Sequence, residues 1–130
     1  MGKHTIKNLK EVEDSAPRFG MSDVLEARFA RDELGLEESG VSYQRLQPDA
    51  RLPFGHKHTE QEELYVVVAG SGRIKLDDEI VDLVQWDAVR IPAGTMRSVE
   101  AGPAGIEIVA YGAPSNGNAD VEMVQGWWSD

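Results

Sequence analysis

Two histidines and a glutamate near the middle of the chain have a spacing that suits metal binding. His56 and His58 are two residues apart, and side chains two apart on an extended segment point the same way, so both imidazoles can reach one point. Glu63 follows a short turn and opens an apolar run that is typical of a strand. Alternation places Glu63, Tyr65 and Val67 on one face of that strand, with the carboxylate at its head.

Two imidazoles and one carboxylate form a facial triad that suits Fe(II), Mn(II), Zn(II) or Ni(II) and leaves coordination positions open for substrate or water. A second interpretation stays open. The two histidines are then solvated side chains, and the carboxylates of Glu60, Glu62 and Glu63 form a charged cluster on an exposed turn.

The elements that must position these residues are short strands. Turn residues recur throughout, and apolar segments between them are short, which predicts an all-β sandwich or small barrel. We expect strands at Val24–Ala30, Val41–Leu46, Leu64–Ala69, Arg73–Leu76, Glu79–Leu83, Ala88–Ile91 and Gly105–Tyr111.

Local signals add four expectations. Thr5–Leu9 is compatible with a short edge strand, and Asn8 has the spacing of a helix cap for one turn. Ser22–Leu36 has a competing helical pattern, and Gly70-Ser71-Gly72 is predicted to be a tight hairpin turn.

The chain resembles the cupin superfamily. The first cupin motif, G-x5-H-x-H-x4-E-x6-G, is matched by His56, His58, Glu63 and Gly70, with Ala50 in place of the leading glycine. The second motif, G-x5-P-x-G-x2-H-x3-N, falls on residues 86 to 101, where Pro92 and Gly94 match.

The resemblance covers roughly residues 41 to 111 and implies a double-stranded β-helix, the cupin jelly-roll barrel, with its pocket at the centre. We expect one domain over residues 1–130, with a core barrel from about 20 to 112 and short terminal arms. The resemblance also supports His56, His58 and Glu63 as metal ligands. The relatives it suggests are small single-domain bacterial cupins.

The second motif departs from the family at three positions. Trp86 and Ala101 replace its first and last residues, and Arg97 stands where the family places a third metal-binding histidine. Arginine stays protonated and has no lone pair to donate, so it cannot be that ligand. A guanidinium about 5 Å from a dication would be repelled by roughly 6 to 7 kcal/mol at an effective dielectric constant of about 20.

Three placements of Arg97 therefore stay open. It turns outward or binds an anionic substrate of a bound metal, it pairs with Glu63 and takes the space of the metal, or it is a surface residue at a strand end.

Three aromatic features are further candidates. Tyr65 lies on the expected inner face and could offer its hydroxyl to a ligand. Tyr43 and Gln44 alternate, so one of them faces the pocket, and we take Tyr43 as the ligand-binding candidate. Trp127-Trp128 is either docked on its own domain or part of a homodimer contact, and we expect a homodimer.

Composition excludes several classes of function. The chain has 23 acidic and 13 basic residues, and this net charge of -10 disfavours nucleic acid and anionic membrane surfaces as partners. It has no cysteine, which excludes thiolate metal sites and cysteine nucleophiles. No signal peptide or long apolar run is visible, so we expect a cytoplasmic protein.

Three functions remain. The first is a metal-dependent oxygenase, isomerase or lyase acting on a small polar substrate, with Arg97 orienting an anionic group. The second is a metal-free barrel that binds a small polar or anionic molecule through Arg97. The third is a dimeric structural protein whose partner is another protein.

Overall fold

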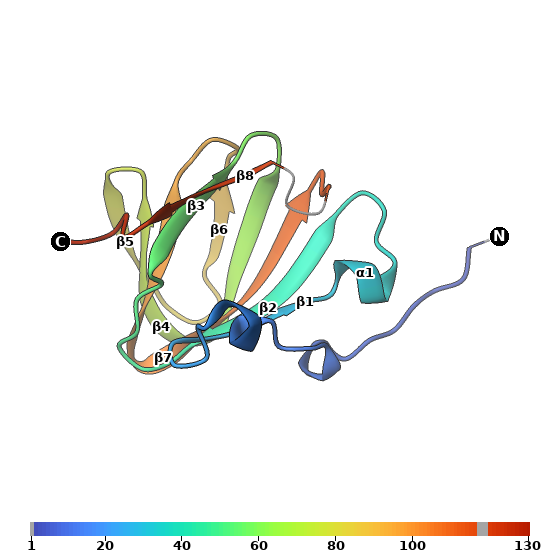
Figure 1. The fold of residues 1–130 in the computed structure, drawn as a ribbon, viewed down its shortest axis with the longest axis horizontal. Coiled ribbons are helices and arrows are strands. Elements are labelled where there is room, and N and C mark those ends of the chain that lie inside the picture. The colour runs from blue at the N-terminus through green and yellow to red at the C-terminus, as the bar shows by residue number, and fades with distance from the viewer. Residues whose placement is uncertain (1, 117–119) are drawn as a thin grey trace.

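The computed structural model describes residues 2–116 and 120–130 and confirms the predicted all-β jelly roll (Figure 1). Two 3-10 turns, η1 (Leu9–Glu11) and η2 (Ala16–Phe19), precede the barrel, and one short helix, α1 (Arg31–Leu34), follows its first strand. The strands are β1 (Leu25–Phe29), β2 (Gly40–Leu46), β3 (Phe54–His58), β4 (Glu62–Leu76), β5 (Glu79–Leu83), β6 (Ala88–Ile91), β7 (Arg97–Ala113) and β8 (Val121–Gln125).

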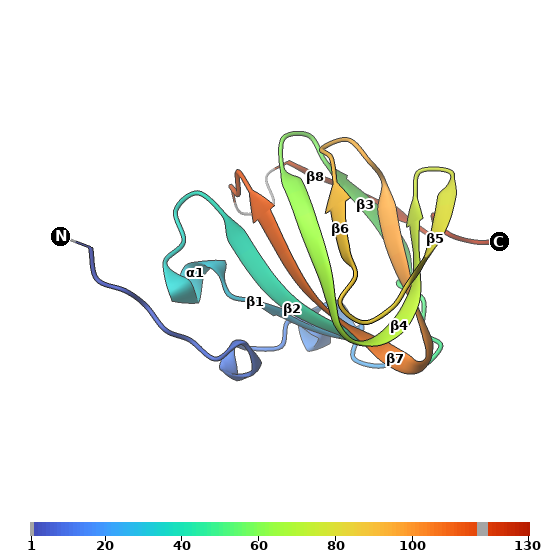
Figure 2. The same cartoon turned by 180° about the vertical axis from the view of Figure 1, so that it is seen from behind.

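Two long strands, β4 and β7, connect the two layers of the barrel, because each takes part in both (Figures 1 and 2). In one layer, the later part of β7 pairs with β2 and the early part of β4 pairs with β6. In the other layer, the late part of β4 pairs with β5, and the start of β7 pairs with β3, which pairs with β8. All of these pairings are antiparallel.

The two long strands change layers where glycines let their backbones approach each other. Gly70 has φ +73°, and a Cβ built on it would lie 2.1 Å from the carbonyl oxygen of Gly105. The register between β4 and β7 shifts on either side of Gly70. The tight turn expected at Gly70-Ser71-Gly72 is therefore wrong. The strand continues through it as a bend, since the facing strand supplies hydrogen-bond partners on both sides.

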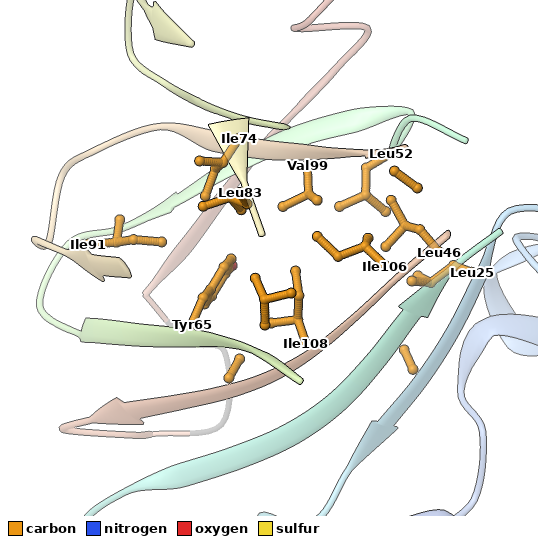
Figure 3. Packing of buried hydrophobic residues seen from close by; sticks show 14 of the residues in the cluster. Leu25, Leu46, Leu52, Tyr65, Ile74, Leu83, Ile91, Val99, Ile106 and Ile108 are labelled. Carbon is orange, nitrogen blue, oxygen red and sulfur yellow. The ribbon is translucent and has the colours of Figure 1, made fainter. Parts of the chain in front are cut away.

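The inner faces of both layers form one apolar core (Figure 3). Tyr65 and Val67 of β4 are buried in it, as the predicted alternation requires. The other large members come from the late part of β4 and from β1, β2, β5, β6 and β7: Ile74, Leu25, Leu46, Leu83, Ile91, Val99, Ile106 and Ile108. Among the described residues, Arg97 is the largest fully buried side chain, and its buried charge requires a partner.

The entry segment differs from the sequence expectation. Asn8 caps η1 by accepting a hydrogen bond from the Lys10 amide, as predicted. Thr5–Leu9, in contrast, forms no strand, and Figure 1 shows the amino-terminal segment running away from the barrel. The helical alternative at Ser22–Leu36 is realised only over Arg31–Leu34, because β1 occupies most of that segment. Among the helices of the described residues, none is long and apolar enough to cross a membrane.

The bend in β4 yields a stability prediction. We expect Gly70→Ala to lower the free energy of unfolding by more than about 2 kcal/mol, because it adds a backbone clash to an unfavourable positive φ. Gly35→Ala is the matched control. Gly35 has φ +71° with open space around it, so its loss should be only about 1 kcal/mol. Urea denaturation measures both values, and equal losses would show that the close approach at Gly70 is unimportant.

Candidate metal centre

The structure brings the three predicted ligands together on the inner side of the barrel. His56 and His58 project from β3, and Glu63 heads β4 after the short turn between the two strands. The two imidazole rings meet edge to face with their centroids 5.3 Å apart. One donor atom from each of the three residues lies within 4.8 Å of the others, so a single ion could contact all three.

The distances within this cluster suit a metal ion. The Nε2 atom of His58 lies 3.3 Å from Oε1 of Glu63, and Nε2 of His56 lies 3.6 Å from the same oxygen. Ligand atoms about 2.1 Å from a tetrahedral or octahedral metal are themselves separated by about 3.0 to 3.4 Å. The His56 side chain is 20% exposed and that of His58 only 6%, so His56 is the more exposed of the two imidazoles.

Arg97 occupies the position opposite His56 and points into the barrel. It is paired with His56 in the β3–β7 register, and its side chain is 1% exposed. One terminal nitrogen, Nη2, donates to Oε1 of Glu63 at 2.9 Å, and Nη1 donates to the carbonyl oxygen of Thr95 at 2.8 Å. The surface and outward placements are therefore wrong, because the buried carboxylate of Glu63 holds the guanidinium inside.

The Glu63 carboxylate is stabilised in its charged form. Burial by itself would raise its pKa, but hydrogen bonds with His56 and His58 and the charge of Arg97 lower the pKa to about 2. For His56, burial dominates and lowers the imidazole pKa, although Glu63 acts in the opposite direction. For His58, burial is outweighed by hydrogen bonds to Glu63 and Asp120, so its pKa is raised. The cluster thus surrounds one carboxylate with a permanent cation, Arg97, and two imidazoles, of which His58 is the more readily protonated.

Asp120 belongs to the site although no local sequence pattern indicates it. Its Oδ1 lies 3.0 Å from Nδ1 of His58, and its Oδ2 accepts hydrogen bonds from the amides of Glu60 and Gln61, each at 3.1 Å. Burial disfavours the charge of Asp120, yet these hydrogen bonds outweigh it and keep its pKa below the ordinary range. Asp120 reaches His58 because β8 pairs with β3, and no sequence motif predicts that pairing.

Tyr65 lies next to the cluster but belongs to the core. It follows Glu63 on the inner face of β4 and is buried among the apolar side chains seen in Figure 3. Its burial, together with the negative charge of Glu63, raises the pKa of the phenol well above the usual range, so it stays protonated. A ligand that approaches Glu63 would therefore meet a hydroxyl group that can still donate.

The expected role of Tyr43 as a pocket residue is corrected by the strand register. Tyr43 pairs with Val109, whereas Gln44 pairs with the core residue Ile108, so Gln44 faces the interior and Tyr43 faces outward. On the outer side, the Tyr43 hydroxyl donates to Glu107 at 2.6 Å. Its side chain is buried although it lies outside the barrel, with the ammonium of Lys10 over its ring.

The tryptophan pair is docked on its own chain. Trp128 is buried under the guanidinium groups of Arg51 and Arg73, which lie 4.4 and 5.3 Å from its ring and both contact Glu100. Trp127 packs against Gly55, where an added Cβ would lie 2.5 Å from the indole ring. The pair therefore fastens the end of the chain beside β3, close to His56.

No protein-family model matches this chain. An uncharacterised protein of Methanocaldococcus jannaschii is 30% identical over 83 residues, which are 59% of this chain and 66% of that protein. The match thus spans just under two thirds of the relative's length.

Comparison with solved structures shows the fold. A cupin protein from Bacteroides fragilis aligns with a TM-score of 0.71 at 23% identity, covering 90% of this chain and 89% of the other. A variant of the Streptomyces protein PAC13, solved with uridine, aligns with a TM-score of 0.74 at 18% identity over 96% and 93% of the two chains. A variant of Bacillus subtilis oxalate decarboxylase gives 0.75 at 22% identity, covering 94% of this chain and 34% of the enzyme. The chain therefore has the barrel fold seen in these cupin structures.

Proposed function

We propose that the barrel binds one divalent transition metal ion through Nε2 of His56, Nε2 of His58 and the carboxylate of Glu63. The observation that carries this proposal is that both imidazoles direct Nε2 at the same carboxylate oxygen, at 3.6 and 3.3 Å. A neutral imidazole that donates through Nδ1 has only a lone pair at Nε2. His58 is such a case, because its Nδ1 faces the Asp120 carboxylate at 3.0 Å, so the lone pair on its Nε2 repels Glu63 unless a proton or a metal ion lies between them.

The donor set favours a particular class of ion. Imidazole nitrogen and carboxylate oxygen, with no thiolate, suit Fe(II), Mn(II), Zn(II) or Ni(II). A metal held there by three protein ligands would supply Lewis-acid or redox chemistry at its open positions. A small polar substrate would reach the ion past the partly exposed His56 side chain, and the oxygenase, isomerase and lyase classes all remain within this proposal.

Arg97 has two effects on such a site. Its contact with Glu63 neutralises the buried carboxylate when no ion is bound, so the empty site is electrostatically satisfied. When an ion enters, the guanidinium competes for the same oxygen and repels the added charge. We therefore expect the ion to bind more weakly than it would with an uncharged residue at position 97.

A metal-free barrel that binds a small polar molecule is the second candidate, and the Arg97–Glu63 contact favours it because that contact replaces the charge of an ion. Arg97 then acts through Glu63 rather than as an open anion anchor, since its side chain is 1% exposed. A structural neighbour solved with uridine is compatible with a small polar ligand in such a barrel.

The homodimer stays a prediction that sedimentation velocity can test. Trp128 is buried within its own chain and is not available to a partner. Leu64 and Tyr111 are instead the candidate residues for a dimer contact. They pair across β4 and β7 and are 39% and 48% exposed.

We expect purified, untagged protein to bind close to one equivalent of a transition metal, and the His56→Ala/His58→Ala double variant to bind none. The reason is that the variant loses two of three ligands. Elemental mass spectrometry after anaerobic loading with Fe(II), Mn(II), Zn(II) or Ni(II) measures the content. His4→Ala is the control for loss of an exposed histidine and should load normally.

Wild-type protein that stays empty with all four ions would overturn the metal proposal. The metal-free candidate would then be tested by a thermal-shift screen of small anions and nucleosides, in which Glu63→Gln should change the response.

Arg97→Met should make the metal-free protein less stable and increase its response to metal. Removing the guanidinium takes the permanent positive charge away from the buried Glu63 carboxylate and leaves only the two histidines beside it, a loss of about 3 kcal/mol. A bound ion replaces the missing charge, so the rise in Tm on adding metal should exceed that of the wild type. Differential scanning calorimetry with and without metal measures both effects.

Arg73→Met is the matched control, because Arg73 also pairs with a glutamate, Glu100, but lies away from the cluster. It should leave the metal-induced shift in Tm at the wild-type value. The competition between Arg97 and the ion is contradicted if both variants respond to metal as the wild type does.

A further inference from the structure

We propose that Asp120 is a positioning residue of the metal centre, which fixes the hydrogen of the His58 imidazole on Nδ1 and presents Nε2 to the ion. The inference rests on the proposed metal site and deepens it by adding a group outside the ligand set. Metal-binding histidines are commonly oriented by such an acceptor behind the ring.

The contacts of Asp120 leave its carboxylate little freedom. Oδ1 faces Nδ1 of His58 at 3.0 Å, while Oδ2 accepts from the amides of Glu60 and Gln61. The backbone carbonyl of Asp120 also accepts a hydrogen bond from the Thr59 amide at 3.1 Å. The side chains of His58 and Asp120 are only 6% and 8% exposed, so water does not compete freely for their contact.

The chemistry of the carboxylate selects the ring tautomer. An ionised carboxylate has acceptors only, so the nitrogen that faces it must carry the hydrogen. In neutral imidazole the other nitrogen then holds the lone pair. For His58 that nitrogen is Nε2, the atom that faces Glu63 at 3.3 Å and would bind the ion.

The same carboxylate also holds the turn that joins two ligands. His58 ends β3 and Glu63 lies one residue into β4, and the amides that Asp120 binds belong to the residues between them. Asp120 itself comes from the residue before β8, which pairs with β3 from Phe54 to His58. The Asp120 side chain, distant in sequence, thus sets both the orientation of the His58 ring and the conformation of the turn that leads from His58 to Glu63.

Asp120→Asn tests the proposal because it keeps the shape and reverses the polarity at one atom. The amide oxygen should stay with the two backbone donors of Glu60 and Gln61, since these require an acceptor. The amide NH2 then faces Nδ1 of His58 and donates to it, which moves the ring hydrogen to Nε2. We expect metal affinity to fall about 10- to 100-fold, while Tm of the metal-free protein changes little.

Two measurements separate positioning from simple structural support. Competition with a chromophoric chelator gives the Kd for Zn(II). Imidazole 15N NMR of the metal-free protein at alkaline pH reports the tautomer, which we expect to be Nδ1–H in the wild type and Nε2–H in Asp120→Asn. Glu122→Gln is the control, since it removes one negative charge from exposed β8 and should change neither result. Asp120→Ala should lower Tm, because it also removes the acceptor for the turn.

Unchanged Zn(II) affinity together with the wild-type tautomer in Asp120→Asn would overturn the role of Asp120. So would a loss of affinity without any change of tautomer, because the carboxylate would then act only through the turn. If the wild type binds no metal, the proposed function fails by itself. The tautomer measurement still decides whether Asp120 orients His58.

Discussion

The carboxylate of Glu63 is the group on which the rest of the site depends. It is a largely buried negative charge, and such a charge is retained only if the surrounding structure supplies compensation. Its Oε1 atom receives a hydrogen bond from Arg97 at 2.9 Å, with Nε2 of His58 and Nε2 of His56 at 3.3 and 3.6 Å. These three groups come from β3 and β7, so side chains from neighbouring strands of the barrel converge on this one carboxylate.

That convergence needs the strands to bend. β4 carries Glu63 at its start and then crosses to the other layer, where β7 brings Arg97 against His56. The crossing is possible because Gly70 lets the two backbones approach more closely than a Cβ would allow. The motif glycine that lies seven residues after Glu63 is therefore a condition for the geometry of the site, although it touches none of the ligands. Sequence spacing and site geometry are linked through this bend.

The parts of this arrangement that are local in sequence could be predicted, and those that depend on long-range register could not. The His56–His58 pair and the inward face of Glu63 follow from alternation along one hairpin. The face of Tyr43 depends on how β2 pairs with β7, and a shift by one residue reverses it. The Asp120 contact depends on β8 lying against β3, across 62 residues of sequence. Arg97 lies between these cases, because its pairing with Glu63 was one of several placements that charge balance allowed.

Arg97 and Asp120 make the geometry of the site independent of metal binding, although the two are usually coupled in metal sites. Where the ligands alone surround an ion, the empty site holds uncompensated charge, and folding then depends on the metal. Here Arg97 compensates Glu63 and Asp120 fixes His58, so the ligand geometry is held by hydrogen bonds that exist without any ion. A centre held in this way does not need tight metal binding to keep its shape. In the proposed metal site, an ion and the Arg97 guanidinium would compete for one carboxylate oxygen, so residue 97 would set the metal affinity.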